Sequence, residues 1–395
     1  MRARLSRNAA ASAAPVRQRA SGMGADAWQH ARMTTLPRVC IVTPALADAN
    51  NGNWHTARRW GEFLSGVADV HITLAWDGTP VDALVALHAR RSADSVERFH
   101  AARPNAPLAL VMTGTDLYRD LQSDPLAQHS LQCASHVVVL QDEGLHTLPA
   151  AARARARSIV QSAPRRVRHD QATTHTGFVA VGHLRDEKDP LTLMRAARRL
   201  TADAAIRIVH IGNPLDAALA DEARRTMQAC PHYRWLGGLA PAAARRWIAR
   251  SRARVHMSRM EGGANVVIEA VRSQVPVLAS RIDGNVGLLG RDYGGYFETG
   301  DDAALAGLMQ RFAADAGFAA HLAAQCRERE PRFAPAEESR AVRGLLSDML
   351  AVADLVAALG TNLAPNLDTH PDTHLDTAGG AGHPEPRPGA RPATD

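Results

Sequence analysis

Lysine is almost missing from this sequence. Of its 46 basic residues 45 are arginine, and Lys188 is the single lysine. Arginine and lysine differ in shape and hydration. Lys188 therefore marks either a position that arginine cannot fill or a chance survival at the surface. Aromatic residues are also scarce, at 4%, and no basic stripe with interleaved aromatics occurs despite a net charge of +6. This composition argues against nucleic acid as a partner.

Other common signatures are missing as well. No apolar run reaches membrane-spanning length, so we expect a soluble protein without stable membrane association. No Walker A, GxGxxG or DxD motif occurs, which disfavours P-loop and nicotinamide enzymes and a metal-bridged diphosphate. The few cysteines lie far apart without zinc spacing, which predicts no metal site and fits a reducing cytoplasm. They are Cys40, Cys133, Cys230 and Cys326.

The length and the 46% hydrophobic content allow two domains with sizeable cores. Residues 1–35 are rich in Ala, Arg and Ser, and we expect them to be disordered, whether they are a transit-like peptide or precede a true start at Met33. The Arg-rich stretch 151–174 predicts the connection between the domains. The predicted parts are a disordered extension 1–35, an N-terminal domain 36–165, a linker 166–174, a C-terminal domain 175–334, a C-terminal helix 335–357 and a disordered tail 358–395.

Short apolar runs alternate with helix-like segments through both halves of the chain. This alternation predicts parallel sheets with helices on both faces, and hence an α/β fold with two doubly wound Rossmann-like domains. In such sheets ligands bind at the carboxyl ends of the strands. The predicted strands are 38–44, 70–75, 83–87, 108–112 and 135–140 in the first half, and 178–181, 206–211, 233–236, 254–257 and 276–279 in the second.

The segment M-E-G-G-A-N-V-V-I-E-A-V, residues 260–271, follows one of these strands. Gly262 and Gly263 allow close backbone approach, and the N-terminus of the helix that follows favours an anion. Glu261 and Glu269, eight residues apart, place a hydroxyl-binding carboxylate at either side of that anion site. A nucleotide-sugar has this arrangement of ribose, diphosphate and hexose. The alternative is an ordinary strand-to-helix turn with two surface glutamates.

A second loop of interest, this one cationic, follows the first strand of the second half. Arg185 and Lys188 are three residues apart, so one helical turn places them on one face. Beside the E-G-G loop these two cations would stabilise a departing diphosphate without a metal. The alternative is a solvated basic turn paired with Asp186 and Glu187.

In the first half, glycines, hydroxyls and two adjacent arginines follow three strands of one sheet. We predict a pocket for a small anion there. The alternatives are a helix N-cap for Thr115 or Asp116 and plain surface charge for the arginines. The predicted acceptor-binding residues are Gly52, Asn53, Thr56, His88, Arg90, Arg91, Thr113, Gly114, Thr115 and Asp116.

Taken together, these motifs over residues 37–356 resemble the retaining GT-B glycosyltransferases, whose two domains face each other across a cleft. In that family the residue matching Glu269 holds the ribose hydroxyls and the one matching Glu261 contacts the donor hexose. The positions matching Arg185 and Lys188 bind the diphosphate. The resemblance therefore implies catalytic roles for Arg185, Lys188 and Glu261. It implies donor binding by Gly262, Gly263, Ala264, Asn265 and Glu269.

A narrower set of strings resembles the selenosugar synthases of selenoneine biosynthesis. They are A-L-H-A-R-R-S, T-G-T-D-L-Y, G-H-L-R-D-E-K-D-P, M-E-G-G-A-N and S-R-I-D-G-N-V-G-L-L-G. That resemblance implies transfer of a hexose from a UDP-sugar, UDP-N-acetylglucosamine or UDP-glucose, to selenophosphate. Both molecules are substrates, and no cofactor is expected. An anionic selenium nucleophile needs no strong general base, and the candidates for one are Asp116 and His88.

The sequence is also compatible with two rival functions. One is a glycosyltransferase with a lipid or glycan hydroxyl as acceptor, against which the scarcity of aromatics argues. The other is a non-catalytic nucleotide-sugar sensor. The sequence leaves open the hexose, the stereochemical outcome and the oligomeric state.

Overall fold

A computed structural model of the chain describes residues 36–46, 52–167, 174–200 and 205–362, and the side chains as far as Asp354. The predicted extension 1–35 lies outside the described residues, as does the predicted tail from residue 363 onward. The tail was predicted to begin at residue 358, but the last helix continues to Asn362. None of the described helices is long and apolar enough to cross a membrane.

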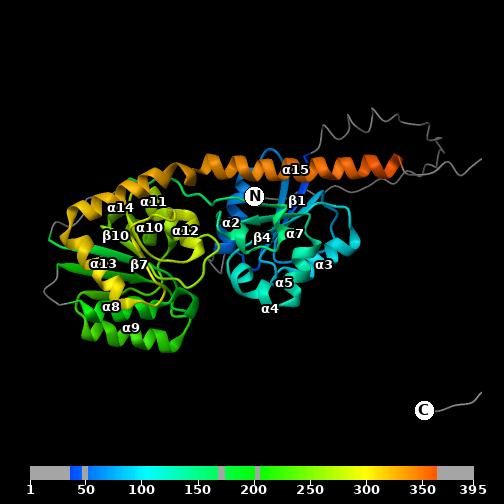
Figure 1. Cartoon of the computed structure of the whole chain (residues 1–395). Coiled ribbons are helices and arrows are strands. Elements are labelled where there is room, and N and C mark those ends of the chain that lie inside the picture. Colours follow the sequence, from blue (N-terminus) through cyan, green and yellow to red (C-terminus); the bar gives the residue numbers. More distant parts are fainter. Residues whose placement is uncertain (1–35, 47–51, 168–173, 201–204, 363–395) are drawn as a thin grey trace, which may run out of the picture. The chain divides into compact units, whose positions relative to one another are not determined.

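The N-terminal sheet has six parallel strands in the order β2-β1-β3-β4-β5-β6 (Figure 1). Its strands are β1 (Arg38–Val42), β2 (Asp69–Thr73), β3 (Ala83–Leu87), β4 (Leu108–Met112), β5 (His136–Val139) and β6 (Ala156–Ser158). The helices are α2 (Gly52–Leu64), α3 (Ala93–Ala102), η2 (Asp116–Asp120), α4 (Leu121–Ser123), α5 (Pro125–Cys133), α6 (Gly144–Thr147) and α7 (Ala150–Arg153).

The C-terminal sheet also has six parallel strands, in the order β12-β11-β10-β7-β8-β9. Its strands are β7 (Thr176–Val181), β8 (Ile206–Ile211), β9 (Tyr233–Trp235), β10 (Ala253–His256), β11 (Val277–Ser280) and β12 (Tyr296–Phe297). The helices are η3 (Asp186–Lys188), α8 (Pro190–Arg199), α9 (Ala217–Ala229), α10 (Pro241–Arg250), α11 (Asn265–Arg272), α12 (Asp283–Leu289), α13 (Asp302–Ala314), α14 (Ala316–Arg329), η4 (Glu330–Phe333) and α15 (Pro335–Asn362). Two parallel sheets with helices confirm the predicted α/β class.

The central strands are buried on both faces, which explains why they are continuous apolar runs. Every residue of β3, β4 and β5 is buried. One face of the N-terminal sheet packs against α3 and α5, and the other against α2 and α15. Several helices begin after an aspartate whose carboxylate accepts backbone N–H groups of the first turn, a favourable N-cap. These aspartates are Asp124, Asp216, Asp301 and Asp315.

The prediction for residues 151–174 needs correction. The stretch 151–174 was predicted as a connection, yet part of α7 and all of β6 lie within it, and β6 extends the N-terminal sheet. Its three residues, A-R-S, are half-buried at the sheet edge and carry no apolar run. Helices α9 and α14 were also missed, although both are long. The predicted domain boundaries themselves stay predictions.

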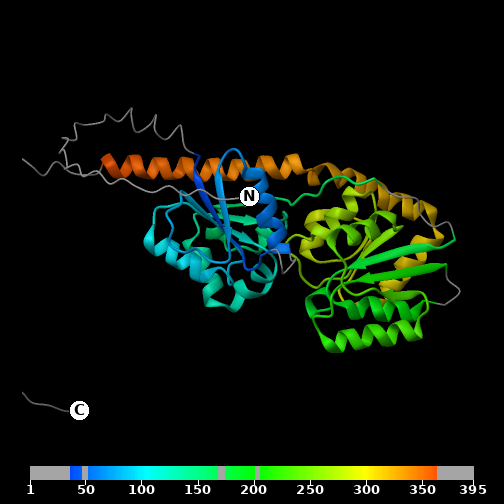
Figure 2. The same ribbon diagram turned by 180° about the vertical axis from the view of Figure 1, so that it is seen from behind.

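Helix α15 leaves the C-terminal domain and packs on the N-terminal sheet through Val342, Leu345 and Met349 (Figures 1 and 2). At its start Glu338 is 1% exposed and accepts five hydrogen bonds. Arg59 donates through Nε at 2.6 Å and Nη2 at 3.0 Å, and Trp60 Nε1 donates at 2.9 Å. Ser162 donates through its backbone N at 2.7 Å and its Oγ at 2.6 Å. One carboxylate therefore joins α2, the segment after β6 and α15.

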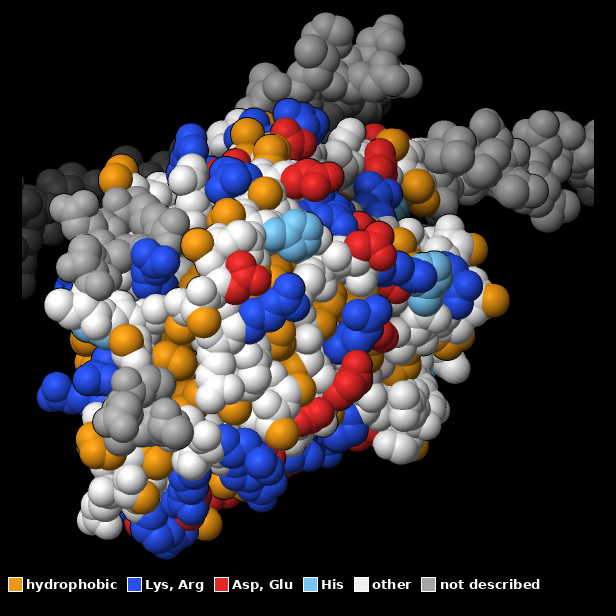
Figure 3. All heavy atoms as spheres, turned by 60° about the vertical axis from the view of Figure 1, so that its left-hand side comes forward, with side chains coloured by type: hydrophobic (Ala, Val, Ile, Leu, Met, Phe, Trp, Pro, Cys, Tyr) orange, Lys and Arg blue, Asp and Glu red, His pale blue; other side chains and the backbone are white. Residues whose placement is uncertain are grey.

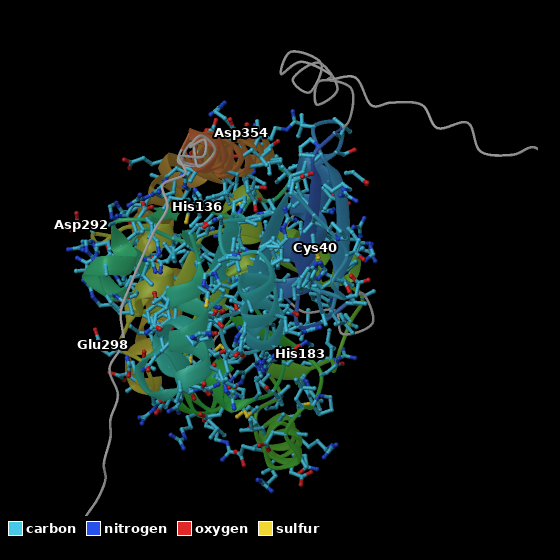
Figure 4. All side chains as sticks on the ribbon, turned by 90° about the vertical axis from the view of Figure 1, so that its right-hand side faces the viewer. Cys40, His136, His183, Asp292, Glu298 and Asp354 are labelled. Carbon is cyan, nitrogen blue, oxygen red and sulfur yellow. The ribbon has the colours of Figure 1, made fainter. Side chains whose placement is uncertain are left out.

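The cysteines, all within the described residues, are free, and three of them are buried. Cys40 lies on β1 inside the N-terminal domain (Figure 4). Burial raises the pKa of the Cys40 thiol to about 11, and Asp77 adds to the shift. The thiol is therefore protonated at neutral pH and behaves as a small apolar side chain rather than as a nucleophile.

His210 on β8 is a fully buried imidazole, and its Nδ1 lies 2.8 Å from the Tyr233 hydroxyl. Burial lowers the pKa of His210 to about 4, and the charge of Arg254 acts in the same direction. As the pH falls, the unfolded chain therefore takes up this proton before the folded chain does. The stabilising contribution is complete above the unfolded pKa of about 6.5 and is lost as the pH falls towards 4.

We therefore expect the free energy of unfolding to fall between about pH 6.5 and pH 4, with up to roughly 3 kcal/mol of this from His210. Urea titrations of the wild type and of His210→Gln at several pH values measure it, and the variant should show a shallower decline. His71→Gln, at an exposed position of β2, is the control and should keep the wild-type profile. Equal pH dependence in the wild type and His210→Gln would contradict the prediction.

Many surface arginines are paired with carboxylates on the same helix. Examples are Arg58 with Glu62 at 2.9 Å and Arg98 with Asp94 at 2.9 Å. On the face shown in Figure 3, basic side chains lie in several separate groups with acidic side chains between them. Exposed pairs of this kind contribute little to stability. The charged groups that matter for stability and function are therefore those that are buried or line cavities.

Candidate active site

A cavity of about 160 Å³ is lined by loops that follow strands of both sheets. From the N-terminal domain it receives residues that follow β1, β3, β4, β5 and β6, and from the C-terminal domain residues that follow β7 and β10. Its lining comprises Gly52, Asn53, Thr56, His88, Arg91, Thr113, Gly114, Thr115, Leu140, Gln161, Arg185, Glu187, Lys188, Met260, Glu261, Gly263 and Asn265. Most of the predicted site residues therefore lie around one space, at the strand ends where the ligands of such sheets bind.

Glu261 is the most highly connected carboxylate in this cavity. Lys188 Nζ donates to Glu261 Oε1, and Ser258 Oγ donates to the same oxygen at 2.7 Å. His256 Nε2 lies 3.3 Å from it. Burial acts to raise the pKa of Glu261, but the charge of Lys188 and the hydrogen bond from His256 outweigh this and hold the pKa well below its usual range. Glu261 is therefore ionised at neutral pH, and Lys188 is its principal counter-charge.

Arg185 lines the same cavity from the loop after β7, and its side chain is 41% exposed. Its Nε lies 3.8 Å from Glu187, and Glu187 in turn lies 3.4 Å from Arg119 of the N-terminal domain. Arg185 thus agrees in part with the alternative of a solvated basic turn, because Glu187 lies beside it. Lys188, however, points to Glu261 and not to Asp186 or Glu187. The structure brings both cations to the cavity wall.

On the N-terminal side, His88 has a positive φ of 74° and is 3% exposed. A left-handed backbone at a non-glycine residue is uncommon and is found at ligand sites. His88 Nε2 lies 3.1 Å from Thr115 Oγ1, and the Arg91 backbone N donates to His88 Nδ1 at 3.4 Å. Burial lowers the pKa of His88, and the neighbouring Asp116 acts in the other direction without reversing the shift. His88 is therefore neutral at neutral pH.

Two predicted acceptor-binding residues lie outside the cavity lining. Asp116 is fully buried, and its carboxylate accepts backbone N–H groups of Thr113 at 2.8 Å, Gly114 at 2.8 Å and Ala89 at 3.0 Å. It holds two loops in place and cannot also reach a ligand. The direct role predicted for Asp116 is thus corrected to a positioning role. Arg90 is paired with Asp124, and its side chain is 52% exposed, which fits the alternative of surface charge.

Gly262 does not line the cavity either. A Cβ added there would lie 2.4 Å from the carbonyl carbon and oxygen of Thr113 and 2.7 Å from the backbone N of Gly114. A Cβ at Gly114 would likewise lie 2.8 Å from the backbone N of Gly262. The two glycines therefore allow the E-G-G loop and the T-G-T loop to touch across the domain boundary. Gly262 is thus needed for this contact, and its predicted role in donor binding stays a prediction.

Glu269 and Ala264 lie on or beside α11 but outside the cavity lining. Ala264 is 2% exposed and precedes the first turn of α11. Arg245 of α10 donates through Nη1 to Glu269 Oε1 over 3.5 Å. Burial raises the pKa of Glu269, although the charges of Arg245 and Arg254 act in the other direction. The carboxylate predicted to hold ribose thus sits one turn along the helix from Asn265, which does line the cavity.

Sequence reasoning missed Gln161, which is 1% exposed and lines the cavity. Thr56 Oγ1 donates to the Gly52 carbonyl at 2.9 Å, so it must accept its second hydrogen bond from Gln161 Nε2. This leaves Gln161 Oε1 as a buried acceptor without a partner among the described residues. Leu140, Met260 and Glu187 were also missed. The only available signal was the position of each residue after a strand or beside a named motif.

Residues 175–315 match the family model of glycosyl transferases group 1. HepE of Anabaena in complex with UDP-glucose superposes with a TM-score of 0.64 at 13% identity, over 79% of this chain and 100% of that chain. The chain has the GT-B glycosyltransferase fold. No curated protein matches its sequence.

Two further structures support the GT-B assignment. Sucrose-phosphate synthase of Thermosynechococcus elongatus superposes with a TM-score of 0.61 at 15% identity, over 80% of this chain and 99% of that chain. The α,α-trehalose 6-phosphate synthase of Burkholderia multivorans gives 0.57 at 13% identity, over 72% and 73%. The family match and the GT-B fold confirm the predicted enzyme class, a glycosyltransferase. None of these proteins tests the resemblance to selenosugar synthases, which stays a prediction.

Proposed function

We propose that this GT-B enzyme transfers a hexose from a UDP-sugar to selenophosphate, giving a selenosugar and UDP. One observation carries the proposal: cationic or hydrogen-bonding groups from both domains line a single cavity. Arg185 and Lys188 come from the domain that matches glycosyl transferases group 1. Arg91 and His88 come from the opposite domain. This arrangement suits two anionic substrates that meet between the domains.

The donor is assigned to the C-terminal side. HepE of Anabaena has been solved with UDP and with UDP-glucose, which supports a UDP-sugar here. Its diphosphate would lie at Arg185, Lys188 and the N-terminus of α11, where backbone N–H groups and the helix dipole favour negative charge. In the free protein Lys188 is bound to Glu261. A diphosphate competes for Lys188, and Glu261 then becomes available to accept a hexose hydroxyl.

The acceptor is assigned to Arg91, Thr113 and Thr115 on the N-terminal side. In the transfer step the C1–O bond to UDP breaks, its electron pair leaves on the β-phosphate oxygen, and selenium forms the new bond to C1. The phosphoryl group stays on selenium in this step. No proton has to be removed, because the selenium nucleophile is already anionic. Lys188 and Arg185 would stabilise the charge that develops on the leaving diphosphate, so we propose a metal-independent reaction.

A hydroxyl acceptor is the second candidate, and one observation favours it. His88 is neutral and buried in the cavity wall, and a neutral imidazole can act as a general base toward a hydroxyl group. Asp116 is unsuited to this task because its oxygens are occupied by backbone N–H groups. A pH profile separates the two reactions. Transfer to a hydroxyl should lose rate as His88 becomes protonated, whereas transfer to selenophosphate should not require that histidine as a base.

UDP release tests the proposal directly. UDP-N-acetylglucosamine and UDP-glucose are each incubated with the enzyme, with and without selenophosphate, and the products are examined by mass spectrometry for selenium. Selenophosphate-dependent release with a selenium-bearing sugar is expected. Inorganic phosphate is the control acceptor and should give no sugar product. Binding of a UDP-sugar without turnover for selenophosphate or any hydroxyl acceptor would instead identify a nucleotide-sugar sensor.

The contact between the two glycine loops yields a separate prediction. Gly262→Ala places a Cβ against the backbone of Thr113 and Gly114, so the loops must move apart. We expect kcat/KM to fall roughly tenfold to a hundredfold, because reacting groups tolerate little misplacement. Steady-state kinetics of UDP release measure the effect. Gly307→Ala on α13 is the control, since its added Cβ meets no atom within 4 Å and should leave kcat/KM unchanged. Equal rates for Gly262→Ala and the wild type would contradict the prediction.

A further inference from the structure

A second cavity, of about 310 Å³, lies apart from the candidate active site. It is formed by the chain that leads from the first sheet to the second and by one side of α10. Four of its six lining residues are arginines, and the others are Val167 and Ala249. The arginines are Arg165, Arg166, Arg245 and Arg246. None of them lines the candidate active site.

The positive charge here exceeds the negative charge within reach. Arg245 lies 3.5 Å from Glu269, a long contact, and Arg165 lies 3.9 Å from Glu330. The Nε atoms of Arg166 and Arg245 are buried and have no hydrogen-bond partner among the described residues. Buried N–H groups of charged side chains are strongly stabilised by a partner. The unsatisfied donors therefore favour an anion in this cavity.

The wall of the cavity is held in a defined position before any ligand binds. Arg272 of α11 donates through Nε to the Ala163 carbonyl at 2.9 Å and pairs with Glu330 at 2.5 Å. The Arg166 backbone N bonds to the Arg272 carbonyl at 3.5 Å. These bonds fix the segment that carries Arg165 and Arg166 against α11. A guanidinium group can bind two phosphate oxygens at once, a geometry that lysine does not offer.

We propose that this cavity is a second anion-binding site, specific for a phosphate or diphosphate group. The group is either a free anion or part of a second nucleotide, because the diphosphate of the donor is assigned to Arg185, Lys188 and the N-terminus of α11. In both cases it binds Arg245 and Arg246 from α10 together with Arg166 from the connecting chain. The site rests on these residues alone and does not depend on the proposed acceptor. An anion here also competes with Glu269 for Arg245, which links the cavity to the helix that begins at the active site.

Pyrophosphate binding tests the site, measured by isothermal titration at low ionic strength. Because pyrophosphate also suits the donor site, the titrations are made in a Lys188→Met background. Arg166→Gln with Arg246→Gln should weaken binding about tenfold to a hundredfold, as expected for the loss of two charged donors. Arg246→Gln alone changes an exposed position and should cause a smaller loss with no change in fold. The matched control is Arg224→Gln with Arg225→Gln, exposed on α9, which removes the same charge and should leave binding unchanged.

Competition by UDP distinguishes the two sources of the phosphate group. If UDP displaces pyrophosphate from the Lys188→Met protein, the group belongs to a nucleotide; if both bind together, the site takes a free anion. Unchanged pyrophosphate affinity in the Arg166→Gln, Arg246→Gln variant would overturn the proposal, as would complete loss of binding in Lys188→Met. Failure of the proposed transfer reaction leaves these outcomes unaffected, because none of them requires turnover.

Discussion

Lys188→Ala is expected to lower kcat/KM for the UDP-sugar by roughly a hundredfold to a thousandfold, the range found when one donor to a developing negative charge is removed. Lys188 lines the active-site cavity and is the principal counter-charge of Glu261. The substitution therefore removes a cation for the leaving diphosphate and alters the carboxylate assigned to the hexose. Steady-state kinetics of UDP release, with each substrate varied in turn, measure the loss.

Two companion variants separate chemistry from folding. Lys188→Arg keeps the charge and should recover only part of the activity, since the larger guanidinium cannot occupy the same space beside Glu261. The double variant Lys188→Ala, Glu261→Gln also replaces the carboxylate that Lys188→Ala leaves unpaired. It should therefore be at least as stable as Lys188→Ala, while its activity stays low. Glu261 keeps Ser258 and His256 as neighbours, and we expect Lys188→Ala to remain folded in thermal unfolding. Near-normal turnover in Lys188→Ala would contradict the donor assignment.

Glu338→Ala is expected to reduce the free energy of unfolding by about 3–5 kcal/mol, the usual effect of removing one partner from a buried ion pair. The carboxylate accepts five hydrogen bonds, and its loss leaves Arg59, Trp60 and Ser162 with unsatisfied donors. Trp60 itself is 1% exposed, so its indole N–H has no access to water. Urea unfolding followed by circular dichroism measures the difference.

The neighbouring residue provides the matched control. Glu337 is paired with Arg340 on the exposed side of the same helix, one position away. Glu337→Ala should change the free energy of unfolding by no more than about 0.5 kcal/mol, as is usual at the surface. Both substitutions replace a glutamate by alanine in the first turn of α15, so the change in helix propensity is the same in the two variants. Similar losses for the two variants would show that the buried network does not fix the helix.

The fold could be predicted from the sequence where burial is strongest. The strands β3 and β4 were predicted with the bounds that the structure has, because strands buried on both faces are continuous apolar runs. The edge strand β6 has no such run and was missed. Helix α14 was missed although Phe318, Leu322 and Cys326 recur at the spacing of one helix face. Its alanine-rich remainder masked this periodicity.

The candidate site could be predicted in part from the rule that ligands bind at the carboxyl ends of the strands. That rule brought together His88, Thr113 and Lys188, which now line one cavity. It does not indicate which way a side chain points, so Asp116 was assigned to a ligand although it binds backbone N–H groups. Nor does it show which loops meet across domains, so the contact of Gly262 with Thr113 was not foreseen. Such pairings depend on tertiary placement rather than on local pattern.

Helix α15 has a consequence for the order in which the chain is built. The N-terminal sheet is translated first, but one of its faces is covered by Val342, Leu345 and Met349, which are translated near the end. While the ribosome is still making the C-terminal domain, Ile41 and Val85 on that face lack part of their apolar cover. Chains usually fold domain by domain during synthesis. Here the domain that leaves the ribosome first is the last to complete its core.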